Sequence, residues 1–353
     1  MASKIDVSEL TLNPEEVRDA GQIILEKEFI NGVLSDNHSI ETGIEHDKNI
    51  VFAGKIVDSL IADNGCAPAE GGTLGFTELT WSPKTYSTRY THCAGDMNNL
   101  LKIFKKAKRM NPDFYDQVDS EAMGLFAARV GTMLREVLPK KVWFSDTTAN
   151  VHTAAGVFTT GTTLGLWNVI DGLWKQIFAG ISSGDENYVE ISKNSGATYA
   201  AQKLAPDDAY NVFEEMVDAM DERLSEDVDA RIYASSSMCK NYRKTLRNKT
   251  LNAGFIEIAE NGKKVLYFDN LPIVEMFVWD STIKASQNNG TIHNLPHRAL
   301  ITTPDNIPVG TLATEDFEEL DSFYDKTLKS NIMDVALSLD TKFLLPYMAV
   351  AAY

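Results

Sequence analysis

Three groups of residues in this chain have the types and spacing that metal binding or acid–base catalysis would use. The first is His293 and His297, four residues apart in the segment His-Asn-Leu-Pro-His. Two histidines at this spacing share one face of a helix and can bind one metal ion, but Pro296 prevents the regular helix that this requires. We therefore interpret the pair as part of a turn.

The other two groups have structural explanations as well. His92 and Cys93, with Asp96 nearby, combine a base, a nucleophile and a carboxylate. Adjacent residues on a strand point in different directions, however, so a packed cysteine is the better interpretation. The carboxylates of Glu214, Glu215, Asp218, Asp221 and Glu222 recur on the outer side of an amphipathic pattern, which is typical of a solvated helix face.

Known catalytic and nucleotide-binding signatures are also missing from the sequence. It contains no GxxxxGK[ST], GxGxxG, GxSxG or HExxH segment. We therefore predict no catalytic residue, no cofactor and no metal site, and we expect that the protein is not an enzyme. An enzyme acting through dispersed carboxylates is the rival class, and it would need a pocket that perturbs their pKa values.

Trp81, Tyr86 and Tyr90 form an aromatic group that only Lys84 and Arg89 accompany. Stacking on nucleic-acid bases would need more cations than these two. A strand that contacts a neighbouring subunit explains the group better, because aromatic residues stabilise contacts between strands. These five residues are therefore candidates for self-assembly.

Composition limits the class of protein further. The chain has 353 residues, 44% of them hydrophobic, and a formal net charge of −17, which disfavours tight binding to phosphate groups. Its three cysteines are widely spaced, so a reducing cytoplasm fits better than a disulfide framework. The sequence begins without a signal-peptide pattern and has no run of about 18 apolar residues, so we expect neither secretion nor membrane insertion.

The basic run 102–109 contrasts with an acidic N-terminal segment; it is either a solvated helix face or a contact with a neighbouring chain.

The sequence of the first half of the chain predicts extended segments that need to pack against another surface. Asn13, Pro14 and Glu16 form the start of a capped helix that carries Val17 and Ile24, two further self-assembly candidates. Residues 63–92 are glycine-rich and then alternate polar and β-prone residues, which predicts an exposed two-stranded extension. The extension indicates oligomerisation, whereas the helix is either an arm that reaches away from the main body or a helix that packs on its own domain.

A long helix follows over 111–139, where apolar residues return at helical spacing. Gly124 and Gly131 lie one heptad apart within it, and they allow close approach by another backbone. We expect a packing contact there. Residues 181–206 form a polar loop, and a boundary near Pro206 is expected.

Residues after Pro206 predict an α+β unit. A helix begins at Asp207-Asp208, a short strand covers 231–234, and a helix capped by Ser235 or Ser236 runs to Leu246. Asn261-Gly262 lies between two apolar segments and predicts a β-hairpin. A second apolar strand covers 298–303.

Taken in this order, the whole chain resembles the major capsid proteins of tailed bacteriophages, which share the Hong Kong 97-type fold. The resemblance rests mainly on ARIYASSSMCKNYRKTL, the Asn261-Gly262 hairpin, DNLPIVEM, HRALITTPDNIPVGT and the C-terminal MDVALSLDTKFLLPYMAVAAY. It implies an α+β fold in five parts. These are an N-terminal arm (1–50), an extended loop (51–100), a peripheral domain with a long spine helix (101–206), an axial domain (207–310) and return strands of the peripheral domain (311–353).

The resemblance further implies a structural protein that assembles with itself into hexamers and pentamers of an icosahedral shell. Such a shell encloses double-stranded DNA without sequence-specific binding, is assembled in the cytoplasm of a bacterial host, and is part of the virion. Scaffold, portal and decoration proteins are the further partners that it implies. Some family members crosslink a Lys to an Asn, but no Lys of this sequence aligns with that position. An encapsulin-like compartment shell, or another oligomeric phage structural protein, is the alternative.

Overall fold

The computed structural model describes residues 34–44, 48–53, 76–93, 121–152, 157–184, 187–249, 256–258, 264–312, 319–325 and 330–353. These residues belong to two compact units, each built from separate stretches of the chain. The first unit takes its residues from 1–46, 83–142 and 309–340, and the second from 47–82, 143–308 and 341–353. The predicted helix with Val17 and Ile24 and the basic run 102–109 lie outside the described residues.

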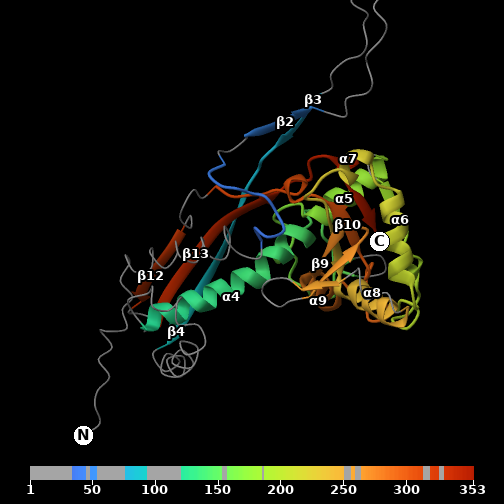
Figure 1. The fold of residues 1–353 in the computed structure, drawn as a ribbon. Coiled ribbons are helices and arrows are strands. Elements are labelled where there is room, and N and C mark those ends of the chain that lie inside the picture. The colour runs from blue at the N-terminus through green and yellow to red at the C-terminus, as the bar shows by residue number, and fades with distance from the viewer. Residues whose placement is uncertain are drawn as a thin grey trace, which may run out of the picture. The chain divides into compact units, whose positions relative to one another are not determined.

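The first unit contains a mixed sheet in which a long strand pairs on both sides. The strand β13 (Ser330–Thr341) runs antiparallel to β12 (Glu319–Asp325) and to β4 (Lys84–Cys93). Short strands β1 (Ile40–Glu41) and β11 (Val309–Gly310) pair in parallel and extend the same sheet. Figure 1 shows β4, β12 and β13 as a long ribbon.

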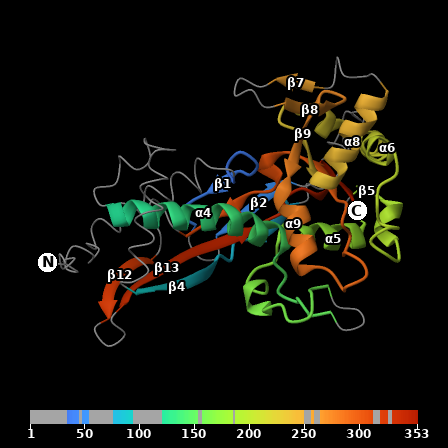
Figure 2. The same ribbon diagram turned by 90° about the horizontal axis from the view of Figure 1, so that it is seen from below.

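The helix α4 (Glu121–Phe144) lies along this ribbon in both Figure 1 and Figure 2. It confirms a long helix in this region, but the prediction that the helix ends at Pro139 is wrong. Proline lacks the N–H that would bond the carbonyl of Arg135, which normally breaks a helix. Leu134, Leu138 and Val142 recur every four residues and are all buried, so packing holds the helix together on both sides of the proline.

Residues 76–93 form two strands that pair with different partners. The strand β3 (Phe76–Thr80) pairs antiparallel with β2 (Asn49–Ala53) in a separate two-stranded sheet. The strand β4, in contrast, belongs to the sheet of β13. The prediction that 63–92 forms a two-stranded extension is therefore wrong for its described residues, 76–92, because the two strands there do not pair with each other.

The second unit is organised around a seven-stranded mixed sheet. In spatial order its strands are β5 (Asn187–Val189), β14 (Val350–Ala352), β10 (Ala299–Thr302), β6 (Arg231–Ser235), β9 (Leu271–Met276), β8 (Lys264–Phe268) and β7 (Ile256–Ile258). The strands predicted over 231–234 and 298–303 are confirmed, as is the antiparallel pairing on either side of Asn261-Gly262. The expectation for 311–353 is one set of return strands of the peripheral domain. The strand β14, however, belongs to the seven-stranded sheet, where it lies between β5 and β10.

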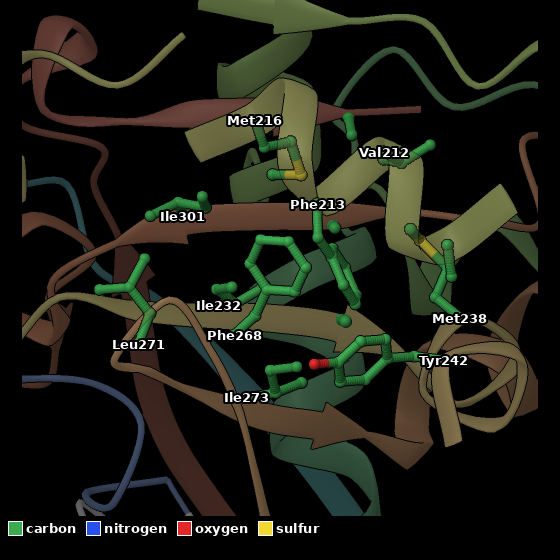
Figure 3. Packing of buried hydrophobic residues seen from close by; sticks show 14 of the residues in the cluster. Val212, Phe213, Met216, Ile232, Met238, Tyr242, Phe268, Leu271, Ile273 and Ile301 are labelled. Atoms are coloured by element: carbon green, nitrogen blue, oxygen red, sulfur yellow. The ribbon is translucent and has the colours of Figure 1, made fainter. Parts of the chain in front are cut away.

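Helices cover both faces of this sheet. On one face, α6 (Asp208–Asp218) packs over β14 and β5, and α8 (Ser236–Asn248) packs over β6 and β9. Figure 3 shows the core beneath them, where the rings of Phe213, Tyr242 and Phe268 meet with centroids 5.5 to 5.8 Å apart. The other helices of the described chain are α5 (Leu173–Ser183), α7 (Glu222–Ser225), α9 (Phe277–Ser286) and short 3-10 turns at Leu164–Leu166, Ser192–Ser195, Pro304–Asn306 and Pro346–Met348.

The other face of the sheet is packed by tryptophans. Tyr233 alternates with Ile232 along β6 and contacts Trp143, which meets Trp279 of α9 edge to face at 4.7 Å. Trp174 of α5 completes the cluster at 4.9 Å from Trp279. Edge-to-face aromatic packing of this kind fixes the orientation of α5 and α9.

The start of α8 is confirmed at the predicted position, but its capping group is different. Ser235 occupies the N-cap position without a side-chain capping bond. Instead, the Asp280 carboxylate of α9 accepts hydrogen bonds from the backbone N–H of Ser236 at 2.6 Å and of Ser237 at 3.2 Å. A buried carboxylate therefore satisfies the helix end and ties α8 to α9.

Candidate functional site

The self-assembly candidates on β4 alternate between two faces of the strand. Arg89 is exposed and donates two hydrogen bonds of 2.6 Å to the carboxylate of Asp334, which lies opposite it on β13. These hydrogen bonds hold the pKa of Asp334 below its ordinary value. The charge of Arg89 is thus engaged within its own chain, where it holds β4 in register with β13.

Tyr86 and Tyr90 lie on the opposite face of β4 and meet α4 of the same chain. The hydroxyl of Tyr90 contacts the sulfur of Met133, and the ammonium of Lys141 lies 5.7 Å from the centre of the Tyr86 ring. Burial, followed by the nearby charge of Lys140, lowers the pKa of Lys141 to about 8. These two tyrosines therefore have packing partners without a neighbouring subunit.

The remaining candidates fall in different environments. The Trp81 side chain is 0% exposed, so burial in its own chain accounts for it without a contact to another copy. Lys84 is exposed at the start of β4, and Gly131 is buried within α4. Gly124 lies in the first turns of α4. A role in self-assembly for these residues, and for Val17 and Ile24, remains a prediction.

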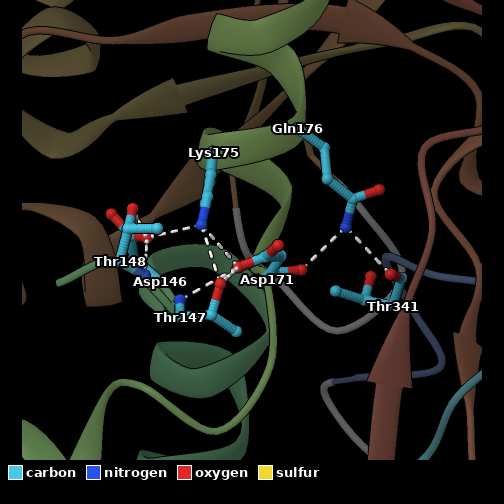
Figure 4. Close-up of polar contacts among 7 residues, drawn as sticks. All are labelled: Asp146, Thr147, Thr148, Asp171, Lys175, Gln176 and Thr341. Atoms are coloured by element: carbon cyan, nitrogen blue, oxygen red, sulfur yellow. Dashed lines mark hydrogen bonds and ion pairs between the residues drawn. The ribbon is translucent and has the colours of Figure 1, made fainter.

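A charged cluster in the second unit joins the segment after α4 to the first turn of α5 (Figure 4). The ammonium of Lys175 lies 2.8 Å from a carboxylate oxygen of Asp146 and 2.8 Å from one of Asp171. The backbone N–H and hydroxyl of Thr147 both donate to Asp171, and those of Thr148 donate to Asp146. One cation therefore serves two carboxylates that the loop backbone also binds.

The pKa values of this cluster show that its charged forms are favoured. Burial alone would raise the pKa of Asp146 and Asp171, but hydrogen bonds from Lys175 and the threonines outweigh it, and both values are lowered. Burial would likewise lower the pKa of Lys175, and its hydrogen bonds to the two carboxylates raise it instead. Asp171 precedes the N-cap of α5 and lies four residues before Lys175, a spacing typical of helix ion pairs and a signal that sequence reasoning missed.

Replacing Lys175 by methionine is expected to lower the free energy of unfolding by about 1–2 kcal/mol, because two carboxylates lose their cation. This exceeds the few tenths typical of an exposed ion pair. Urea unfolding of the purified protein measures this loss. Lys240→Met, at an exposed position of α8, is the control. Equal losses in the two variants would show that the cluster contributes nothing beyond helix surface charge.

The cluster continues to the C-terminal end of β13 and the residues that follow it. The side-chain amide of Gln176 donates to the carbonyls of Asp171 and Thr341, at 2.7 and 2.9 Å, and its oxygen accepts from the N–H of Phe343 (Figure 4). Residues 341–343 are thereby fixed against α5 by two hydrogen bonds to one side chain.

The two histidines that the sequence singled out take different partners. His293 packs on the ring of Tyr199, whereas His297 is buried and bonded at both ring nitrogens. Its Nε2 lies 2.6 Å from the carbonyl of Gln202, and its Nδ1 lies 2.7 Å from the hydroxyl of Ser237. A carbonyl can only accept, so Nε2 carries the proton and Nδ1 accepts from Ser237. His297 is a neutral structural hydrogen-bonding residue.

Lowering the pH from about 7 to 5 is expected to destabilise the protein through His297. Burial lowers the pKa of His297, although its bond to the Gln202 carbonyl opposes this. The stabilising neutral form is thus fully present above the unfolded pKa of about 6.5 and is lost as the pH falls through the lower folded value. His297→Gln should flatten the dependence of the unfolding free energy on pH.

The control for this prediction is His152→Gln, a substitution at a less buried histidine. It removes a histidine without altering the hydrogen bonds of His297, so a pH dependence that flattens only in His297→Gln assigns the effect to His297. An unchanged slope in His297→Gln would contradict the assignment.

Several large apolar side chains are exposed in the described part of the chain. Val228 is 96% exposed between Asp227 and Asp229, and Phe277 at the start of α9 is 68% exposed. Leu166, Tyr188 and Tyr199 are exposed to a smaller extent. Single exposed apolar side chains are normal on protein surfaces and do not by themselves mark a contact.

Two features are absent from the residues that the structure describes: a cluster of metal-ligating side chains and a helix that could cross a membrane. Over the described ranges, no three His, Cys, Asp or Glu side chains gather as a metal site would require. No helix in that part of the chain has the length and hydropathy to cross a membrane.

No family model and no curated protein matches the sequence. Solved structures do match the fold. A chain of the satellite phage P4 procapsid, in a structure that includes the size determination (Sid) protein, aligns with a TM-score of 0.55 and 9% identity, over 94% of this chain and 89% of its own. A chain of Gordonia phage Cozz aligns with a TM-score of 0.50 and 10% identity, over 91% and 85%. The predicted α+β, Hong Kong 97-type capsid fold is therefore confirmed.

Proposed function

We propose that this chain is a major capsid protein, a structural subunit that assembles with itself into the hexamers and pentamers of an icosahedral phage shell. The observation that carries the proposal is the extent of the fold match. It covers 94% of this chain and 89% of a chain from a procapsid. A match over nearly the full length of both chains supports a shared role better than a match to a single motif would.

The charge of the chain supports double-stranded DNA as the enclosed cargo. A net charge of −17 disfavours tight binding to the phosphate backbone, so packed DNA would not adhere to the inner surface. We assign the protein no enzymatic activity. In this proposal it is part of the virion, is assembled in the cytoplasm of a bacterial host, and meets scaffold, portal and decoration proteins as further partners.

Electron microscopy of the concentrated, purified protein, with sedimentation of the same sample, tests the proposal. Closed shells, or rings of five and six subunits, are the expected result. A uniform monomer or dimer under all conditions, also after co-expression with neighbouring phage structural genes, would contradict it.

The content of such particles tests the cargo. Particles isolated from infected cells should hold double-stranded DNA that is protected from nuclease until the particles are opened. The ratio of nucleic-acid absorbance to protein absorbance, and nuclease digestion of the opened particles, measure this DNA. Particles filled with a folded protein instead would favour the encapsulin-like compartment shell.

A further inference from the structure

Two helices of the second unit carry opposite charges on their exposed sides. The acidic side begins on α6 with Glu214, Glu215 and Asp218, and it continues through the exposed residues Glu222, Glu226, Asp227 and Asp229. Arg223 is the one basic residue between Glu214 and Asp229. We call the three carboxylates on α6 the acidic face.

The basic side lies on α8. Lys240, Lys244 and Arg247 are exposed at positions i, i+4 and i+7, so they line one side of the helix. No acidic residue occurs within α8. In a chain with a net charge of −17, three neighbouring cations are a marked departure from the average. We call these three residues the basic face.

Neither face is neutralised by the residues that the structure describes. Among the residues that the structure describes, the one ion pair between α6 and α8 joins Asp207 to Lys249 at 3.5 Å, at the ends of the two helices. Arg243, on a more buried side of α8, is engaged by Glu275 at 2.6 Å. The six residues of the acidic and basic faces form no ion pair in the described part of the chain.

Both faces cost stability in the isolated chain. Like charges three or four residues apart repel each other on a helix, and this applies to Glu214 with Asp218 and to Lys240 with Lys244. Asp218 also lies at the C-terminal end of α6, where the helix dipole disfavours a negative charge. Such unfavourable placement of charges on a helix is expected where contacts with a partner offset its cost in folding free energy.

The positions of the two helices determine which partner fits. They lie on the same face of the seven-stranded sheet, α6 over β5 and β14 and α8 over β6 and β9. The acidic and basic faces therefore belong to different halves of one sheet. A second copy of the chain can place its basic face against the acidic face of the first, and the same contact can repeat from copy to copy.

We propose that the acidic face of one copy binds the basic face of the next, in a head-to-tail contact that closes into a ring. This inference rests on the proposed shell function and names the surfaces that join neighbouring subunits. The contact is heterologous, because each copy uses two different surfaces, and a heterologous contact with a closing rotation generates a ring. Added salt weakens it, because exposed charges are screened over about 8–10 Å at moderate ionic strength.

Charge reversal tests the proposal. The first variant is Glu214→Lys, Glu215→Lys, Asp218→Lys, and the second is Lys240→Glu, Lys244→Glu, Arg247→Glu. Each variant alone should need a protein concentration about tenfold or more above that of the unchanged protein to assemble, because facing charges now repel. The chain that carries all six reversals should assemble again, since its two faces are complementary once more.

Mixing the first and second variants gives a sharper result. Each variant repels itself, but in the mixture the two reversed faces attract each other and the two unreversed faces attract each other, so the two variants alternate around a ring. Alternation is possible only with an even number of subunits. The mixture should therefore form six-membered rings and no five-membered rings, which electron microscopy can count.

Matched controls keep the net charge constant. Lys240→Arg, Lys244→Arg, Arg247→Lys preserves the basic face, and Glu214→Asp, Glu215→Asp, Asp218→Glu preserves the acidic face; both should assemble like the unchanged protein. Circular dichroism confirms that every variant is folded. Normal assembly of either charge-reversed variant would overturn this inference and leave the shell function standing. Absence of assembly by the unchanged protein would overturn both.

Discussion

Replacing Arg298 by alanine is expected to lower the free energy of unfolding by about 4 kcal/mol. The side chain is 1% exposed, and its guanidinium lies 5.0 to 5.4 Å from the rings of Phe144, Trp174 and Phe178. It donates to the carbonyls of Leu295 and Asn294 and to the side-chain oxygen of Gln287. Alanine leaves these acceptors buried without a donor and opens a cavity beside three rings.

The charge of Arg298 persists at neutral pH despite its burial. Desolvation lowers the pKa of Arg298 to about 9, which is still above the physiological range. Arg298→Lys keeps the charge but loses the planar stacking and the forked donors, so it should recover only part of the stability. This graded order separates the role of the guanidinium from the role of the charge.

Thermal and urea unfolding of the dissociated protein measure the effect of the Arg298 substitutions. Arg247→Ala, at an exposed site on α8, is the control and should change stability by less than about 0.5 kcal/mol. A loss of that small size in Arg298→Ala would show that the aromatic cluster packs equally well without the guanidinium.

Replacing Gly172 by alanine is expected to cost about 3 kcal/mol, because there is no room for a Cβ atom. Gly172 is the N-cap of α5, and its N–H donates to the carbonyl of Ser145 at 2.8 Å. A Cβ there would lie 2.8 Å from the backbone nitrogen of Ser145 and 2.9 Å from its oxygen. Backbone atoms cannot rotate away as a flexible side chain can, so the chain around α5 must shift.

Gly165→Ala is the matched control for Gly172, because a Cβ at Gly165 meets no atom within 4 Å. Its effect on the free energy of unfolding should be within about 0.5 kcal/mol of zero. The same unfolding experiments compare the two variants. Equal stability of the two alanine variants would contradict the close approach of Gly172 to Ser145.

Features with a local cause could be predicted from the sequence. The strand at 231–234 and the start of α8 follow from a short β-prone run next to serines, and β7 and β8 pair on either side of Asn261-Gly262. The outer carboxylates of α6 are exposed, as the amphipathic pattern indicated. In each case the determining residues lie within one element or one turn.

Features that depend on distant residues could not be predicted in this way. Arg89 binds Asp334, which is 245 positions away, and nothing near either residue indicates the other. Asp280 caps α8 from 44 positions away, although serines at the helix start offered a local alternative. The continuation of α4 through Pro139 depends on the burial of its apolar side, which tertiary packing decides.

The candidate site also combines features with a local cause and features that depend on distant residues. Asp171 and Lys175 have a spacing that a search for helix ion pairs would find, whereas Asp146 reaches them only through the fold. Arg298 lies beside an apolar strand and resembles an ordinary flanking cation in sequence. Its burial among three aromatic rings from 144–178 depends on contacts across more than a hundred residues.

The position of β14 inside the seven-stranded sheet determines when this protein can fold during its synthesis. Residues 350–352 insert between β5 and β10, so the sheet remains divided until they have left the ribosome. Strands this distant in sequence pair slowly, because closing a long loop costs conformational entropy before the new contacts contribute stabilising free energy. Because α6 packs on β14 as well as on β5 and α8, its final position depends in part on that late pairing. The surface that carries the acidic face is therefore expected to reach its final form after β14 has paired.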